Sequence, residues 1–189
     1  MFQTPEESIR RELDPSEQLL WFGQPAQGFI LRSSDAFLVP FSIIWGGFAI
    51  FWEVSVVSEG APLDFAIFGV PFVLMGLYIM FGRFWVDARQ RANTTFGVTP
   101  ERIIIISGLF SRHVKSINLD TLSDLSITEK ANGVGTISFG NIPFWAWIYG
   151  GAAWPGLGFQ AVPQFELIPN ARSTYEIVRA AQRATKRSA

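Results

Sequence analysis

Two apolar stretches near the start of the chain decide its fold class. The first is AFLVPFSIIWGGFAIFW, residues 36–52, and the second is FAIFGVPFVLMGLYIMFG, residues 65–82. Neither stretch contains a charged side chain. As helices they would rise roughly 26–27 Å, slightly less than the ~30 Å hydrocarbon core of a bilayer. We interpret them as two membrane-spanning helices joined as a hairpin over residues 36–86.

Each helix is expected to extend past one charged residue, Glu53 in the first and Arg83 in the second, whose side chain would snorkel to the interface. The predicted spans are therefore about 36–57 and 65–86. The alternative is a pair of buried helices in a soluble protein, but helices that are apolar on every side usually exceed what a small core encloses. The composition also favours a membrane protein, with 49% hydrophobic and only 16% charged residues.

The charges around the hairpin predict its orientation. Arg32 precedes the first stretch and Arg83 follows the second, whereas the connector Glu53–Asp64 holds acidic residues and no Lys or Arg. Because positive charge is retained on the cytoplasmic side, both termini should be cytoplasmic. We therefore expect a multi-pass protein of the bacterial inner (cytoplasmic) membrane, in which residues 1–35 form a cytoplasmic N-terminal segment.

The pattern changes near Asn93, and residues 93–189 are long enough for one small domain. Short apolar stretches separated by turn residues predict antiparallel strands. After Pro169-Asn170, apolar residues recur at helical spacing and predict an amphipathic helix. The expected strands lie at Thr94–Thr99, Arg102–Ser107, Val114–Leu119, Leu122–Ile127, Ile137–Phe139 and Phe165–Ile168, and the apolar helix face is Ala171, Tyr175, Val178, Ala181 and Thr185. In the second strand, the unbroken Ile103–Ile106 run suggests burial on both faces of the sheet.

Residues 83–104 follow the pattern R-F-x-x-D-x-x-x-R-x-x-T-x-F-x-V-T-x-E-R-I-I, and G-V-G-T-I follows at 133–137. Together with P-x-F-E-x-I at 163–168, this run resembles the bacterial pleckstrin-homology-like (PH-like) family of membrane proteins. The resemblance implies an α+β membrane protein. Its two transmembrane helices would precede a PH-like antiparallel β-barrel or sandwich, capped by a C-terminal amphipathic helix. It also implies a binding or assembly module with no chemistry attached to the motif.

Eukaryotic relatives of this fold often hold phosphoinositides through several Lys and Arg residues around the first two strands. Here that region offers Arg102 with Glu101 beside it, so these residues do not support such a site. The same fold elsewhere binds peptides along a strand edge, which requires no charged signature.

The chain lacks the residues that several classes of protein need for catalysis, metal binding or nucleic-acid binding. There is one histidine, His113, and no cysteine, which argues against a zinc site or a cysteine nucleophile. No nucleophile elbow or phosphate-binding loop is visible, so we predict no enzyme, no catalytic residue, no metal and no cofactor. A net charge of −1 argues against nucleic-acid binding.

Two features are candidate contact sites. The segment Ile142–Phe159 is apolar, aromatic and uncharged, and it either meets a membrane or partner or packs over the domain's own core. The C-terminal helix carries a basic face that either approaches the anionic leaflet or is simply solvated. The candidate residues are Phe144, Trp145, Trp147, Tyr149 and Trp154 in the segment, and Arg179, Arg183 and Lys186 on the helix.

We therefore expect a membrane-anchored, non-catalytic binding or assembly module. Lipids would surround the hairpin, and the partner would be another protein or a second copy of the chain. Two alternatives stay open. One is a lipid-contacting module that uses segment 142–159 and the basic helix. The other is an accessory subunit of a transport or envelope complex.

Overall fold

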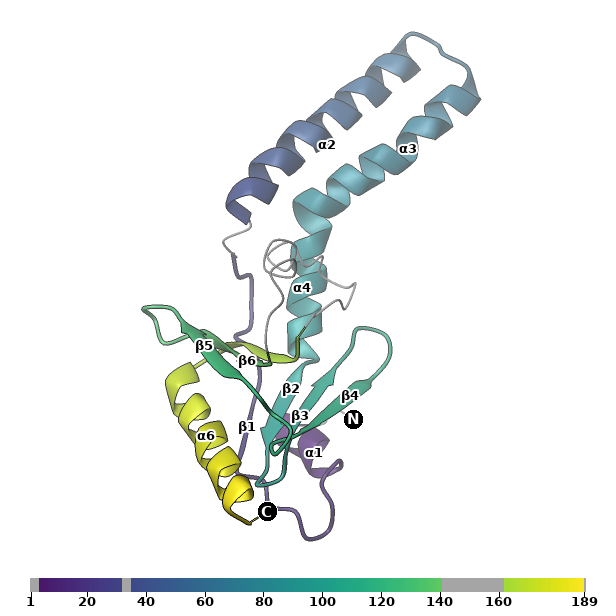
Figure 1. Ribbon diagram of the computed structural model, residues 1–189. Coiled ribbons are helices and arrows are strands. Elements are labelled where there is room, and N and C mark those ends of the chain that lie inside the picture. The colour runs from purple at the N-terminus through teal and green to yellow at the C-terminus, as the bar shows by residue number, and fades with distance from the viewer. Residues whose placement is uncertain (1–3, 32–34, 141–161, 189) are drawn as a thin grey trace. The chain divides into compact units, whose positions relative to one another are not determined.

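The computed structural model describes residues 4–31, 35–140 and 162–188 (Figure 1). The chain forms two compact units. One, here called the hairpin unit, is Phe29–Asp87. The other, the sheet unit, combines Met1–Gly28 with Ala88–Ala189. The sheet unit is therefore built from both sides of the hairpin, and the N-terminal segment contributes to it.

The hairpin unit holds α2 (Asp35–Ser58), α3 (Leu63–Leu77) and the π-helix η1 (Tyr78–Gly82), which leads into α4 (Arg83–Ala92). Both α2 and the continuous helical run Leu63–Ala92 are long and apolar enough to cross a membrane. In each, only 17% of the most apolar window is buried, whereas a helix in a soluble core would be mostly buried.

Two glycines allow α2 and α3 to approach closely. A Cβ atom added at Gly76 would lie 2.8 Å from the Cα of Gly46, and one added at Gly46 would lie 2.7 Å from the sulfur of Met80. Small residues at a helix contact are typical of membrane hairpins, because apolar packing replaces the hydrophobic effect there.

A buried ion pair joins the two ends of the hairpin unit. Arg83 Nη1 lies 2.7 Å from Asp35 Oδ1, and the two side chains are only 8% and 7% exposed. The Arg83 guanidinium also lies 4.4 Å from the centre of the Phe84 ring. The sequence predicted a snorkelling side chain at Arg83, but Asp35 holds it inside the protein instead.

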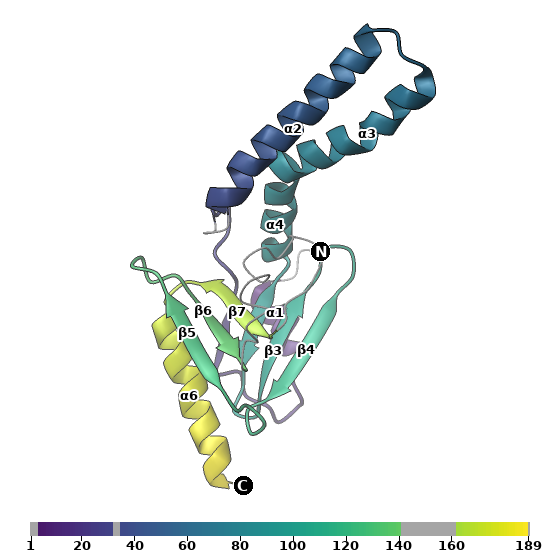
Figure 2. The ribbon, with the colours of Figure 1, turned by 45° about the horizontal axis from the view of Figure 1, so that its top comes forward.

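The sheet unit contains two antiparallel sheets (Figure 2). Sheet A has the order β1 (Trp21–Gly23), β2 (Thr95–Val98), β3 (Arg102–Ser107) and β4 (His113–Asn118). Sheet B has the order β5 (Leu125–Glu129), β6 (Gly135–Phe139) and β7 (Gln164–Ile168), and α6 (Ala171–Ser188) follows it. The described strands form a sandwich of four and three strands and do not close into a barrel. The predicted α+β fold, with six strands followed by a helix, is confirmed, and sheet A has one more strand, β1.

Strand β1 precedes the hairpin yet pairs with β2, which follows it. Trp21 lies opposite Val98 and Gly23 opposite Phe96, and the Leu20 amide donates to the Val98 carbonyl at 2.9 Å. The whole hairpin unit is thus inserted between two neighbouring strands of one sheet.

The connections to the hairpin leave sheet A side by side, through a segment here called the neck (residues 24–28 and 88–94). The Arg91 guanidinium donates to the carbonyls of Ala26 at 2.6 Å and Gly28 at 2.7 Å. The Gln27 side chain donates back to the Arg91 carbonyl at 3.3 Å. These bonds hold the outgoing and returning chains together.

The core lies between the sheets, with Phe165 at its centre. This fully buried ring lies 4.5 Å from Phe96 and 4.8 Å from Phe139 between ring centroids, and 5.6 Å from Trp21. The predicted face of α6 covers the same core, with Val178 fully buried. The rings of this aromatic cluster come from β1, β2, β6 and β7, so the cluster joins the two sheets.

The other face of sheet A is covered by the N-terminal helix α1 (Pro5–Arg10), which the sequence analysis did not predict. Its Ile9 is fully buried against Ile104 and Ile106. Ile103 and Ile105 face the main core. The expectation that the isoleucine run is buried on both faces is confirmed.

Replacing Phe165 by alanine should lower the free energy of unfolding by about 3–5 kcal/mol, because it leaves a cavity among three aromatic rings. Denaturant unfolding of the detergent-solubilised protein measures this change. The matched control is Phe110→Ala, since Phe110 is 103% exposed and its removal should leave the stability within about 0.5 kcal/mol. Equal stability of both variants would show that Phe165 does not organise the core.

Candidate binding surface

Strand β4 lies at the end of sheet A, and five of its six residues are exposed. The Leu119 amide donates to the Glu101 carbonyl at 2.9 Å, immediately beyond the Arg102–Asn118 pair. Since bonded and non-bonded pairs alternate along an antiparallel ladder, the backbone groups of Val114, Ser116 and Asn118 point away from β3. No described strand pairs with that edge.

The side chains of β4 limit what this edge can bind. Lys115 lies opposite Ile105 in the middle of the strand and is exposed. A lysine on an edge strand disfavours indiscriminate pairing with other strands. The edge therefore offers free backbone groups for strand pairing, and the positive charge of Lys115 favours a segment with an acidic residue.

A hollow of about 530 Å³ lies next to the β3–β4 turn. Within the turn, Gly108 has a φ of +151°, and a Cβ atom there would collide with the carbonyl oxygen of Ser111, so only glycine fits. Arg112 fixes the base of the turn by contacting the Ser8 carbonyl at 3.1 Å and the Glu12 carboxylate at 2.9 Å. The hollow is lined by Pro5, Ser8, Gln24, Ala92, Asn93, Thr95, Ile106, Ser107, Gly108, Leu109, Phe110, Ser111 and Arg112.

At the opposite end of sheet A, Glu17 holds Arg102. The Glu17 carboxylate, only 3% exposed, accepts from Arg102 Nη2 at 2.6 Å and from the Thr99 hydroxyl at 2.7 Å. The hydrogen bond from Arg102 is the main reason that the pKa of Glu17 is lowered from 4.5 to about 2. Arg102 also contacts Asp14 at 3.3 Å. Arg102, the cation that the sequence analysis considered for a phosphoinositide site, is thus engaged inside the domain.

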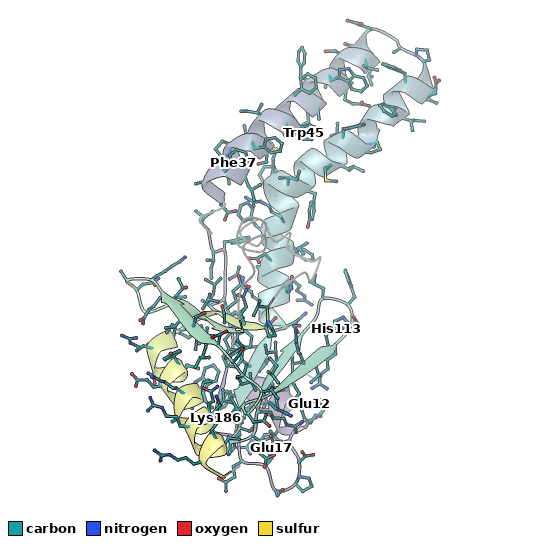
Figure 3. The ribbon with its side chains drawn as sticks, in the orientation of Figure 1. Glu12, Glu17, Phe37, Trp45, His113 and Lys186 are labelled. Carbon is teal, nitrogen blue, oxygen red and sulfur yellow. The ribbon has the colours of Figure 1, made fainter. Side chains whose placement is uncertain are left out.

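The predicted basic face of α6 lies on its exposed side, opposite Val178 (Figure 3). At 100° per residue, its five cations occupy a wedge of about 100°, and Glu176 lies among them. The Thr185 hydroxyl donates to the Pro100 carbonyl at 2.7 Å, so the C-terminal part of α6 lies at the β2–β3 turn. The exposed cations are Arg172, Arg179, Arg183, Lys186 and Arg187.

The aromatic candidates Phe144, Trp145, Trp147, Tyr149 and Trp154 lie outside the described residues. Their role as a membrane or partner contact stays a prediction. His113 is exposed at the start of β4, and its Nε2 lies 2.9 Å from the Ser111 hydroxyl (Figure 3). Among the described residues, no group of three His, Cys, Asp or Glu side chains is placed to hold a metal ion.

A family model of the bacterial PH domain matches residues 41–179. The chain belongs to the bacterial PH domain family. The match runs from within α2 to within α6, so it includes most of the hairpin and strands β2 to β7 of this PH-like domain, whereas β1 precedes it. No curated protein and no solved structure matches the chain.

The structure adds two features of the PH-like domain that the sequence analysis missed: the open edge of β4 and the exposed Phe110. The pair Leu109-Phe110, set between a glycine and a serine within a turn, was a visible signal. No such signal marks the open edge, because local sequence does not determine the order of strands within a sheet.

The low pKa of Glu17 predicts how stability depends on pH. A carboxylate whose pKa is lower in the folded protein stabilises it fully above pH 4.5, and this contribution is lost as the pH falls towards 2. Glu17→Gln should therefore lower the free energy of unfolding by about 2 kcal/mol at pH 7, and the deficit should shrink below pH 4.5. Denaturant unfolding across this pH range measures it.

Asp14→Asn is the matched control for Glu17→Gln. The Asp14 side chain is 74% exposed and also contacts Arg102, so its loss should cost less than about 1 kcal/mol. A deficit for Glu17→Gln that stays constant from pH 7 down to pH 3 would contradict the assigned role of the ionised carboxylate.

Proposed function

We propose that this protein is a membrane-anchored, non-catalytic binding or assembly module of the bacterial inner membrane. The hairpin crosses the bilayer, both termini are cytoplasmic, and the PH-like domain works at the cytoplasmic face. The length and low burial of α2 and of Leu63–Ala92 support the anchor. Arg32, which precedes the first apolar stretch of the sequence, and Arg83, which follows the second, support the orientation. PH domains are generally binding modules, which supports a non-catalytic role.

The observation that carries the binding role is the open edge of β4. An extended segment of another protein adds to this edge as a further strand, bonding to the outward backbone groups of Val114, Ser116 and Asn118. The main-chain bonds provide affinity, and Lys115 selects a segment with an acidic side chain. The partner is another protein or a second copy of this chain.

A second candidate function is that of an accessory subunit of a transport or envelope complex, bound through the hairpin. It is favoured by an apolar hollow of about 210 Å³ on the hairpin unit. A side chain from a neighbouring transmembrane helix would fit this hollow through apolar packing. The hollow is lined by Trp45, Phe48, Ala49, Trp52, Phe68 and Phe72.

Photocrosslinking in intact cells tests the role of β4. A photoreactive amino acid at Val114 or Asn118 should crosslink one extended segment of one protein, identified by mass spectrometry. The same probe at Ala180, on the exposed side of α6, should not crosslink that segment.

Ser116 provides a matched pair of variants for this experiment. Ser116→Pro removes the outward amide in the centre of the edge without removing a bond to β3, whereas Ser116→Ala keeps the amide. The crosslink should be lost with proline and kept with alanine. Equal crosslinking of the two variants would exclude strand addition, and a partner that co-purifies regardless of Ser116 would favour binding through the hairpin.

A further inference from the structure

The tip of the β3–β4 turn presents an aromatic ring that the fold does not use. Phe110 is 103% exposed, and Leu109 precedes it. The hairpin Ser107–Asn118 carries Arg112, His113 and Lys115 and no carboxylate of its own, although Glu12 pairs with Arg112. An apolar tip above basic residues is the arrangement that suits an anionic membrane surface.

The register of sheet A places this turn at one particular end of the sheet. Ile106, one residue before the turn, lies opposite Thr95, the first residue of β2. Gly23, the last residue of β1, pairs with Phe96 at the same end. The neck therefore leaves sheet A where the β3–β4 turn projects. Residues from both, Ala92 and Phe110 among them, line the same hollow.

The lengths of the connecting elements limit the distance that can separate this end of sheet A from the bilayer. The 15 residues of α3 and the 5 of η1 rise about 30 Å together, which matches the hydrocarbon core and puts Arg83 at its boundary. The 10 residues of α4 rise at most about 15 Å beyond it. The turn extends about 10 Å past Ile106 at ~3.3 Å per residue, so Phe110 is within reach of the headgroup layer.

We infer that the β3–β4 turn inserts Phe110 into the cytoplasmic leaflet of the bilayer that holds the hairpin, and this inference rests on the proposed membrane anchor. Gly108 and the contacts of Arg112 with Ser8 and Glu12 fix the shape of the turn, so the turn loses little conformational freedom on insertion. Because the same chain already spans the bilayer, the contact is intramolecular and needs little affinity of its own.

This contact is distinct from the basic face of α6. Thr185 bonds to Pro100 at the β2–β3 turn, the opposite end of sheet A from Phe110. Insertion of Phe110 therefore turns the C-terminal part of α6 towards the cytoplasm.

The absence of cysteine from the sequence allows a direct test by spin labelling. Full-length Phe110→Cys, Lys186→Cys and Phe48→Cys are labelled and placed in vesicles of phosphatidylethanolamine and phosphatidylglycerol. Power saturation then compares the access of oxygen, which enters the bilayer, with that of a nickel chelate, which stays in water. Phe48, 65% exposed on α2, reports the hydrocarbon, and Lys186 reports the end of α6.

The label at position 110 should be more accessible to oxygen than to the nickel chelate. Its ratio of oxygen to nickel accessibility should lie between the ratios measured at positions 48 and 186. Equal values at positions 110 and 186, with position 48 still in the hydrocarbon, would overturn this inference and leave the anchor intact. Loss of the bilayer signal at position 48 would instead refute the anchor. A label at position 110 shielded from both reagents would indicate contact with a second copy and also overturn the inference.

The thermal unfolding midpoint provides the folding control. Because Phe110 makes no buried contact, the labelled Phe110→Cys protein should unfold at the same temperature as the unsubstituted protein. The spin-label result then reports on the membrane contact and not on a damaged domain.

Discussion

The pairing of β1 with β2 is the constraint on which the rest of the structure depends. A chain that has formed Trp21–Gly23 must pass through the whole hairpin before Thr95–Val98 can pair with it. Closing so long a connection costs entropy that three strand residues do not offset alone. The packing of Trp21 on Phe165 and the hydrogen bonds of Arg91 within the neck help to offset this entropy cost.

Three arginines hold the places where distant parts of the chain meet. Arg83 pairs with Asp35 inside the hairpin unit, Arg91 bonds to Ala26 and Gly28 in the neck, and Arg102 binds Glu17 beside sheet A. A guanidinium suits this task because its planar group donates to several acceptors at once. All three lie in the 83–104 motif, which explains why that motif specifies the fold.

The same arrangement leaves particular surfaces open. In sheet A, β2 and β3 are buried by α1 on one side and the aromatic core on the other, while β4 keeps a free edge among the described residues. This edge is the surface on which the proposed binding role rests. The cations of α6 lie elsewhere, on a helix whose apolar face is fully occupied by the core.

The sequence by itself determined the hairpin, six of the strands and the C-terminal helix. Each is encoded by a local pattern: an uncharged apolar length, alternation, or helical spacing. The bounds of β3 match the prediction, and the buried face of α6 contains Ala171, Val178 and Ala181 as expected. The family resemblance was also visible, because its motif residues are close in sequence.

Only the tertiary structure decided how these elements are joined. Strand β1 has three residues, too few to show alternation, and it forms because β2 lies beside it. The burial of the Arg83 side chain depends on Asp35, which is far away in sequence, so local sequence alone predicted that this side chain would snorkel. The open edge of β4 follows from strand order. These features rest on contacts between residues separated by the hairpin or by whole strands, and no local pattern records such contacts.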